Sequence, residues 1–280
     1  MENWSTVIKP RDRFLDLGLG EVWKKKYLLW LFVKRDISVK FKQTIFGFAW
    51  YVISPLLSTL IYIIIFGKIA GIPTDEVPQP LFYLSGVCLW NYFSQCLTKV
   101  AATFQGESGI YGKVYFPRLI SPLSYLFSFL VKFSVQLLTL VIMYVFYAVS
   151  GMGLHPNWAL CLFPLQVILL AMIALGLGLI VTSLTTKYRD LKNIFGVIVS
   201  LWMYATPIVY PMSAIENPAL RTAMRLNPLS SIVESFRYGL FGAGEFSWPD
   251  LGYSAACAIV LCIIGMLLFK HKEKLFIDTI

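Results

Sequence analysis

The sequence predicts an all-α integral membrane protein with six transmembrane helices. Of its 280 residues, 58% are hydrophobic and only 14% are charged, whereas charged residues make up about a quarter of an ordinary soluble domain. Several apolar stretches are also longer than the roughly 18 residues that mark a membrane-spanning helix. Such stretches carry too few charges for core helices of a soluble α/β protein, so residues 1–280 are expected to form one membrane domain.

Six stretches have the length and hydropathy of a spanning helix. They are Phe48–Ile69, Leu81–Phe104, Leu119–Val149, Ala159–Leu184, Ile194–Pro211 and Gly252–Lys270. The third, at about 31 residues and 1.5 Å per residue, would reach roughly 46 Å, so it must tilt or project beyond the hydrocarbon layer. Residues 1–47 then form a cytoplasmic interfacial segment, residues 48–270 the six-span core, and residues 271–280 a cytoplasmic tail.

The basic residues orient these helices. Nineteen of the 24 Lys and Arg precede the first span, follow the last, or lie at the ends and loops after spans two and four, whereas four lie on the opposite side. Because basic loops remain in the cytoplasm, both termini are expected there. The net charge of +9 is explained by this topology and by anionic lipid headgroups, so no nucleic-acid partner is implied.

Two stretches outside the spans have helical character. Glu21–Lys42 places aromatic and aliphatic residues between clusters of Lys and Arg, which is typical of a helix at the cytoplasmic membrane interface. The external segment Met212–Leu251 contains Asn-Pro pairs at Asn217 and Asn227, each followed by helix-compatible sequence. The second predicted helix has an apolar face, and it either dips into the outer leaflet or forms a simple external loop. That face consists of Leu229, Ile232, Val233, Phe236 and Leu240.

Three residues inside the spans are unusual for a membrane helix. Pro55 and Pro207 each remove a backbone hydrogen bond, so spans one and five are expected to kink. Lys132 in span three is costly unless it faces protein, water or a counter-charge. It either snorkels toward the interface or, with Gln136 one turn on, meets an anionic substrate group; a structural role is the simplest interpretation.

The sequence argues against a catalytic site or a bound cofactor in this chain. All five cysteines lie in apolar segments at spacings unlike zinc or redox motifs, and only His155 and His271 are available as imidazole ligands. A membrane-embedded glycosyl or acyl transferase would need a base and metal-binding carboxylates. Asp75 and Glu76, in an external loop, are the only acidic pair, so an enzyme is disfavoured.

Residues 106–118, GESGIYGKVYFPR, resemble the start of a phosphate-binding loop. In such a loop four residues separate the first glycine from Gly-Lys, and a hydroxyl residue follows the lysine. Here five residues separate Gly106 from Gly112, and Val114 follows Lys113. The chain therefore lacks a nucleotide site of this kind, and any use of ATP must occur through a partner.

Four stretches together carry a family resemblance. They are Arg35–Leu57, Lys113–Ser124, Tyr188–Pro211 and Asn227–Gly242. In this order and spacing they resemble the membrane subunits of type 2 ABC exporters, which move polysaccharides out of bacteria, and most of all an O-antigen permease. The resemblance covers nearly the whole chain. It implies export across the bacterial cytoplasmic membrane, with capsule, teichoic acid, a small lipid or a drug as alternative cargoes.

The resemblance also implies partners and a mechanism. It implies a homodimer bound to two copies of a separate ATPase, which would hold ATP and Mg²⁺, and a polyprenyl-diphosphate-linked polysaccharide moving through a channel at the dimer interface. A coupling helix near Phe104–Gly112 would dock on the ATPase. Arg35 and Asp36 would form ion pairs within the subunit or with the ATPase, although a simple juxtamembrane anchor is equally open. The candidate coupling residues are Gly106, Glu107, Ile110, Tyr111, Lys113, Arg118, Arg35, Asp36 and Arg189.

Aromatic residues, 16% of the chain, supply candidates for the channel wall because sugars stack on flat aromatic faces. Six of them lie in spans one and five: Trp50, Tyr51, Tyr62, Trp202, Tyr204 and Tyr210. Trp50, Tyr51 and Tyr210 are near helix ends, where membrane interfaces also collect Trp and Tyr. These three residues could therefore lie at the membrane–water interface instead of lining a channel.

Overall fold

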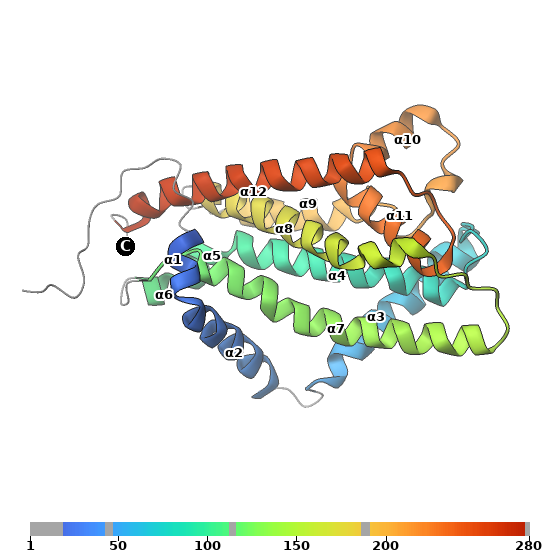
Figure 1. Cartoon of the computed structure of the whole chain (residues 1–280), viewed down its shortest axis with the longest axis horizontal. Coiled ribbons are helices and arrows are strands. Elements are labelled where there is room, and N and C mark those ends of the chain that lie inside the picture. The colour runs from blue at the N-terminus through green and yellow to red at the C-terminus, as the bar shows by residue number, and fades with distance from the viewer. Residues whose placement is uncertain (1–18, 43–46, 112–115, 186–190, 278–280) are drawn as a thin grey trace, which may run out of the picture.

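The computed structural model of the chain describes residues 19–42, 47–111, 116–185 and 191–277. Within these ranges the chain forms helices, turns and loops, with no strand, which confirms the predicted all-α class for the described part. Four long helices run along the longest axis of the molecule (Figure 1). They are α4 (Gln79–Ala101), α7 (Ile120–Val149), α8 (Phe163–Thr185) and α12 (Trp248–Ile277).

Four helical segments of the described residues are long and apolar enough to cross a membrane. They are Ala49–Ile69, Ile120–Val149, Trp158–Thr185 and Trp248–Lys272, and they coincide with predicted spans one, three, four and six. The second predicted span corresponds to α4, which has 23 residues but carries polar side chains such as Asn91, Gln95 and Lys99. The fifth corresponds to α9 (Leu191–Trp202), which has only 12 residues.

The first predicted span is a helix with two geometries. α3 (Ala49–Tyr62) runs through Pro55 without ending, and wider π-helical turns, η1, follow over Ile63–Ile69. Only 11% of its apolar window is buried against the rest of the chain. The helix therefore presents most of its apolar surface outward.

The fifth predicted span is wrong as a continuous helix to Pro211. α9 ends at Trp202, and turns and bends occupy residues 203–210. Pro207 lies within this segment rather than at a kink inside a helix. Proline lacks a backbone N–H and disfavours helical geometry in the residue before it, so the helix cannot resume there without strain.

The predicted coupling helix also differs from the structure. Instead of one helix near Phe104–Gly112, two single turns follow α4: α5 (Thr103–Gly106) and α6 (Ser108–Tyr111). The N-terminal helical stretch is likewise two helices, α1 (Leu19–Lys24) and α2 (Lys26–Lys42), set at an angle to the bundle (Figure 1). Three aromatic residues of this stretch are largely exposed: Trp23, Tyr27 and Trp30.

The bundle is held together at a close crossing of α8 and α12. A Cβ added at Gly176 would collide with the backbone of Leu261 and Cys262, and one added at Gly265 would collide with the backbone of Gly176. Small residues allow helix backbones to approach in membranes, where apolar burial alone gives little driving force between helices. These glycines therefore set the distance between the two helices.

The end opposite α5 and α6 holds the shorter elements (Figure 1). These are η2 (Trp158–Leu162), η3 (Met212–Ala214), α10 (Pro218–Arg225) and α11 (Pro228–Phe241). The Oδ1 atoms of Asn217 and Asn227 accept hydrogen bonds from backbone N–H groups in the first turns of α10 and α11, as N-cap residues do. Both predicted helices are confirmed, and the predicted apolar face of α11 is buried.

Candidate functional site

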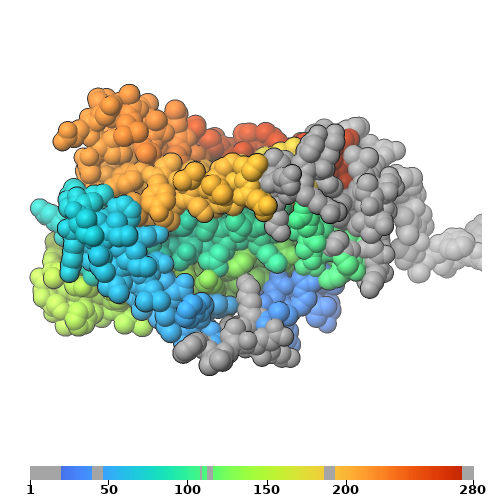
Figure 2. Space-filling model, turned by 180° about the vertical axis from the view of Figure 1, so that it is seen from behind, coloured from blue at the N-terminus to red at the C-terminus, as the bar shows by residue number. Residues whose placement is uncertain are grey.

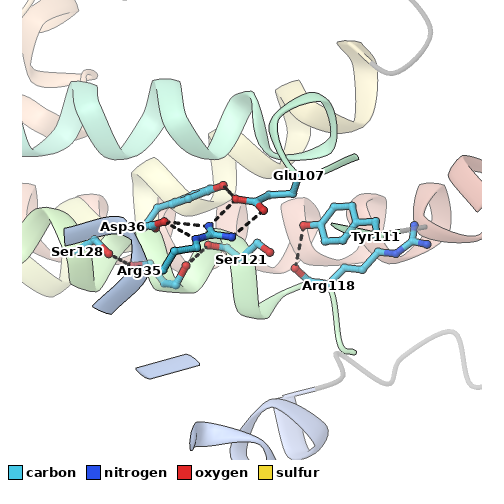
Figure 3. Close-up of polar contacts among 9 residues, drawn as sticks. Arg35, Asp36, Glu107, Tyr111, Arg118, Ser121 and Ser128 are labelled. Atoms are coloured by element: carbon cyan, nitrogen blue, oxygen red, sulfur yellow. Dashed lines mark hydrogen bonds and ion pairs between the residues drawn. The ribbon is translucent and has the colours of Figure 1, made fainter. Parts of the chain in front are cut away.

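An ion pair between partly buried Arg35 and buried Glu107 joins α2 to the turn between α5 and α6. Arg35 Nη2 lies 2.7 Å from Glu107 Oε1, and its Nη1 lies 3.1 Å from Oε2, so the contact is bidentate (Figure 3). Tyr125 of α7 donates its hydroxyl to the same Oε1 at 2.6 Å. Glu107 is 6% exposed. One carboxylate thus connects three elements at the α5–α6 end of the bundle.

Asp36 binds the other side of the same guanidinium. Its Oδ1 lies 3.0 Å from Arg35 Nε and 2.9 Å from Nη2, whereas Oδ2 is buried and has no hydrogen-bond partner in the described part of the chain. Burial acts to lower the pKa of Arg35, but hydrogen bonds to Glu107 and Asp36 outweigh it and raise the pKa. Arg35 therefore remains charged, and the cluster carries more carboxylate than guanidinium.

Aromatic rings surround this cluster. The Phe104 ring stacks on Phe269 of α12 at 4.6 Å between centroids, and Phe116 lies 5.3 Å from Phe32 of α2 and 5.7 Å from Tyr111. A groove of about 560 Å³ opens between α2 and α6. It is lined by Leu28, Leu31, Phe32, Lys34, Arg35, Ser38, Ile110 and Phe116. The short helices after α4 are therefore packed against α2, α7 and α12 together.

The structure brings most of the predicted coupling residues to this end. Glu107, Tyr111 and Arg118 are buried, with the Arg118 guanidinium 5.1 Å from the centre of the Tyr111 ring. Ile110 is half-buried, and Gly106 ends α5 with open space around it. Lys113 and Arg189 lie outside the described residues. The sequence analysis missed Tyr125 and Phe269, because an aromatic residue inside an apolar helix gives no signal of its own.

The six aromatic candidates for a channel wall divide between two places. Near the end of α9, the Tyr62 hydroxyl lies 3.2 Å from Met203 Sδ, Trp202 packs edge-on against Phe93, and Tyr210 donates a hydrogen bond to the Tyr204 carbonyl oxygen. Trp50 and Tyr51 lie instead in the first turn of α3. Figure 2 shows α3 and α9 at the surface of the same face of the molecule.

Arg237 of α11 fills the space where α9 breaks. It is 2% exposed, and its two terminal nitrogens donate at 2.6 Å to the carbonyl oxygens of Pro207 and Ile208. The guanidinium carbon lies 3.7 Å from the centre of the Phe82 ring in α4. A buried arginine thus supplies hydrogen bonds that the broken helix cannot make itself. Arg237 is one of the four basic residues that the sequence analysis assigns to the side opposite the cytoplasm, and nothing in its neighbourhood indicated this role.

Glu234 lies beside this arginine, with 3.8 Å between Glu234 Oε1 and Arg237 Nη1. Burial raises the pKa of Glu234 to about 7, with Asp75 adding to the shift and Arg237, Arg221 and the Met212 backbone opposing it. Burial correspondingly lowers the pKa of Arg237. Glu234 therefore gains or loses its charge close to neutral pH, beside a guanidinium.

Comparison with known proteins places these features in a family context. Residues 27–241 match the ABC-2 type transporter family. The chain is 27% identical over 265 residues to the O-antigen export system permease protein RfbA of Myxococcus xanthus, covering 93% of this chain and 98% of that one. It is 27% identical over 254 residues to the protein of the same name in Klebsiella pneumoniae, with coverages of 90% and 95%. Against the polysialic acid transport protein KpsM of Escherichia coli, identity is 21% over 254 residues, with coverages of 88% and 93%.

Proposed function

The chain belongs to the ABC-2 type transporter family, and from this we propose that it is the membrane-spanning subunit of an ATP-driven exporter of lipid-linked polysaccharide. O-antigen is the preferred cargo, because the O-antigen permeases are matched at 27% identity and the polysialic acid transporter at 21%. Capsule, teichoic acid, and a small lipid or drug are the alternatives. A fold alone does not determine the cargo.

The proposed topology has six crossings of the cytoplasmic membrane. They are α3 with η1, α4, α7, α8, α9 with the turns after it, and α12. The direction of these elements supports it, because α4, α8 and α12 run toward the α5–α6 end while α7 and α9 run away from it (Figure 1). The distribution of basic residues supports a cytoplasmic location for that end and for both termini.

The channel is proposed to form between two copies of the chain. The supporting observation is the break at residues 203–210, where Tyr204 is 50% exposed. Non-helical backbone at membrane depth is tolerated only where protein covers it or where it lines a water-filled cavity. A second copy across this face would meet both conditions, and Tyr62, Trp202, Tyr204 and Tyr210 would then border the space between the copies.

The α5–α6 turns are proposed to receive the motion of a separate ATPase. Two ATPase copies would bind ATP and Mg²⁺, and each would press on α5–α6 of one subunit. The bidentate contact between Arg35 and Glu107 would transmit that motion to α2, while the Tyr125 hydroxyl would transmit it to α7. Glu107 and Tyr125 are buried and Arg35 is partly buried. The hydrogen bonds between them give the proposed path a defined geometry, which suits a mechanical link.

The first experiment is co-purification with a candidate ATPase subunit expressed together with this chain, followed by ATP turnover with and without lipid-linked glycan. A complex of two plus two subunits whose turnover rises with glycan would support both partner and cargo. Turnover that ignores glycan but responds to a drug or another lipid would overturn the cargo and keep the exporter. A chain that recovers no ATPase would overturn the proposed subunit role.

A further inference from the structure

Four aromatic residues form a cluster where η2, α11 and α12 meet, at the end of the bundle opposite α5 and α6. The rings of Trp158 and Trp248 are nearly parallel, with 5.6 Å between their centroids. The Phe246 ring packs edge-on against both of them at 5.1 Å and stacks on Tyr238 at 5.7 Å. This Trp158–Trp248 cluster therefore connects three elements, and it has no part in the Arg35–Glu107 contact.

The backbone beneath the cluster is fixed by contacts within the chain. The N–H of Asn157 donates to the carbonyl oxygen of Gly239 at 3.0 Å, and its Nδ2 donates to that of Tyr238 at 2.9 Å. A Cβ built at Gly239 would lie 2.7 Å from the backbone nitrogen of Leu160, so α11 and η2 approach each other closely. The rings are therefore held in place before any partner binds.

The two indole rings remain exposed although they pack together. Trp158 is 53% exposed and Trp248 is 57% exposed. Within the described residues neither indole N–H is hydrogen-bonded, so each can donate to a partner outside the chain. Tryptophan, with an apolar ring and a polar N–H, is enriched where a membrane meets water.

The exposed surface changes from polar to apolar at this cluster. Two of the segments that are long and apolar enough to cross a membrane begin at its tryptophans, namely Trp158–Thr185 and Trp248–Lys272. Polar residues precede them, including the exposed His155 and the part-exposed Glu245. Exposed apolar side chains follow them along α8 and α12: Leu165, Ile168, Ile259 and Val260.

The length of α12 agrees with a membrane boundary at Trp248. From Trp248 to Lys270 the helix advances 22 residues, or about 33 Å at 1.5 Å per residue. The hydrocarbon core of a bilayer is about 30 Å thick. Trp248 and Lys270 therefore lie one hydrocarbon thickness apart, as residues at the two surfaces of a membrane do.

We propose that the Trp158–Trp248 cluster binds phospholipid in the headgroup region of the leaflet farther from α5 and α6. The indole N–H groups would donate to ester or phosphate oxygens of the lipid, and the rings would contact the upper part of its acyl chains. The cluster would thereby anchor η2, α11 and α12 at the membrane surface. This inference needs the chain to span a membrane, but it needs neither the proposed cargo nor the proposed channel.

A sugar chain is the other partner that exposed aromatic rings could take. A sugar stacks on an open ring face, whereas Trp158 and Trp248 are nearly parallel and cover part of each other's faces. A sugar would also leave unexplained why both apolar segments begin at these two residues. The observations therefore favour lipid.

The test measures tryptophan fluorescence of the full-length protein in phosphatidylcholine nanodiscs. The phosphatidylcholine carries a nitroxide quencher either on its headgroup or at the end of an acyl chain. The difference in signal between wild type and the double variant Trp158→Phe, Trp248→Phe isolates the two indoles. The headgroup label should quench this difference at least about twice as strongly as the chain-end label, because the bilayer centre lies about 15 Å below the edge of the hydrocarbon core.

Trp90→Phe is the matched control. Trp90 lies in α4 and is only 9% exposed, so the signal that this variant removes should be quenched little by either label. Phenylalanine keeps an aromatic ring at each position, and the melting temperatures of all variants should stay close to that of wild type. The single variants Trp158→Phe and Trp248→Phe should each show the same preference for the headgroup label.

Three outcomes would overturn the anchor. Stronger quenching by the chain-end label would place the rings in the hydrocarbon core, and no quenching by either label would remove the lipid contact. In the second case, protection of the rings from aqueous iodide by an added oligosaccharide would identify a sugar-binding surface instead. The same depth preference in Trp90→Phe would mean that the signal does not come from the cluster.

ATP turnover in the complex separates this inference from the proposed function. Quenching that places the two rings at the headgroups, together with turnover that ignores glycan, would retain the anchor and reject the cargo.

Discussion

Arg35 is the residue with the most connections at the α5–α6 end. It holds Glu107 through two hydrogen bonds and Asp36 through two more, while its guanidinium lies 4.4 Å from the centre of the Phe32 ring. Loss of this side chain would leave the Glu107 carboxylate buried beside Asp36 with no cation between them. The first expected effect is separation of α2 from α5–α6 rather than loss of the bundle.

Arg35→Gln is therefore expected to uncouple the transporter. ATP hydrolysis by the assembled complex should persist, but glycan export should fall at least about tenfold, because the bidentate link would be lost. Lys34→Gln, the neighbouring residue, removes the same charge without that contact and is the control. Export and ATP hydrolysis should be measured on the same membranes, and parallel losses of both would contradict the coupling role.

The raised pKa of Glu234 is expected to make the stability of the end that contains α10 and α11 depend on pH. Its pKa is raised by burial to about 7, above the ordinary glutamate value of about 4.3, so the folded state retains a proton that the unfolded chain releases. The stabilising contribution is therefore complete below about pH 4.3 and is lost as pH rises through about 7. The loss is at most on the order of 4 kcal/mol, from roughly 1.4 kcal/mol per pKa unit.

Glu234→Gln isolates this effect. The glutamine amide does not titrate, so the difference in melting temperature between wild type and variant should change between pH 5 and pH 8. The melting temperature of the wild type should fall relative to that of the variant as pH rises. The two proteins are scanned in the same detergent, so titration elsewhere cancels in the difference. A constant difference across that range would rule out Glu234 as the titrating group.

The sequence predicts features that depend on neighbouring residues, but it does not predict contacts between residues that are far apart in the chain. Asn227 before Pro228 predicts a helix start because the cap bond and the proline lie within three residues of each other, and the structure contains that helix. The pairing of Arg35 with Glu107 joins positions 72 apart, so neither residue's neighbours indicate it. The sequence analysis left the partner of Arg35 open, and only the fold identifies it.

The end of α9 at Trp202 is a second feature that depends on a residue distant in the sequence. The segment from Ile194 to Pro211 is apolar throughout, so hydropathy predicts one continuous span. The turns at residues 203–210 form because Arg237, about 30 positions later, supplies donors for the carbonyls of Pro207 and Ile208. The hydropathy of a segment does not show that a distant arginine satisfies the carbonyl groups of non-helical backbone. The extents of α7 and α8, by contrast, followed closely from hydropathy.

The turns α5 and α6 present an open surface that can be blocked without disturbing the interior. Nothing lies within 4 Å of a Cβ built at Gly109 in α6. Gly109→Trp should therefore leave the subunit inserted and folded but abolish recovery of the ATPase, because the bulky side chain would occupy the docking surface. Gly252→Trp, in α12 at the opposite end, has equally open surroundings and is the control.

The measurement is ATPase recovered per subunit after affinity purification. Full recovery with Gly109→Trp would place the docking surface elsewhere. Loss of recovery in both variants would indicate general damage to the subunit rather than a blocked surface, and would also count against the assignment to α6.

At the level of the whole molecule, one face is incomplete in a single chain. α9 exposes Ile194, Val197, Ile198 and Leu201, each at least 51% exposed. α3 exposes Leu57, Leu60 and Ile61, and η1 exposes Ile64 and Ile65. Figure 2 shows α3 and α9 on the same face of the molecule. Lipid alone could cover such apolar side chains. The backbone of Tyr204 and Ala205 beside them is non-helical, although its N–H and C=O groups are hydrogen-bonded within the chain. Non-helical backbone at membrane depth requires protein or a water-filled cavity beside it rather than lipid.

This requirement predicts where two copies meet. A photoreactive benzoylphenylalanine in place of Val197 should cross-link one copy to another in native membranes, because α9 would face its partner across the channel. The same residue in place of Ile259 on α12, which is 50% exposed, should capture lipid and leave the chain monomeric on a denaturing gel. The comparison is made at matched expression and light dose, so random collision contributes equally to both. If Ile259 cross-linked and Val197 did not, the copies would meet through α12. The turns at residues 203–210 would then need some other cover, and the proposed channel would lose its wall.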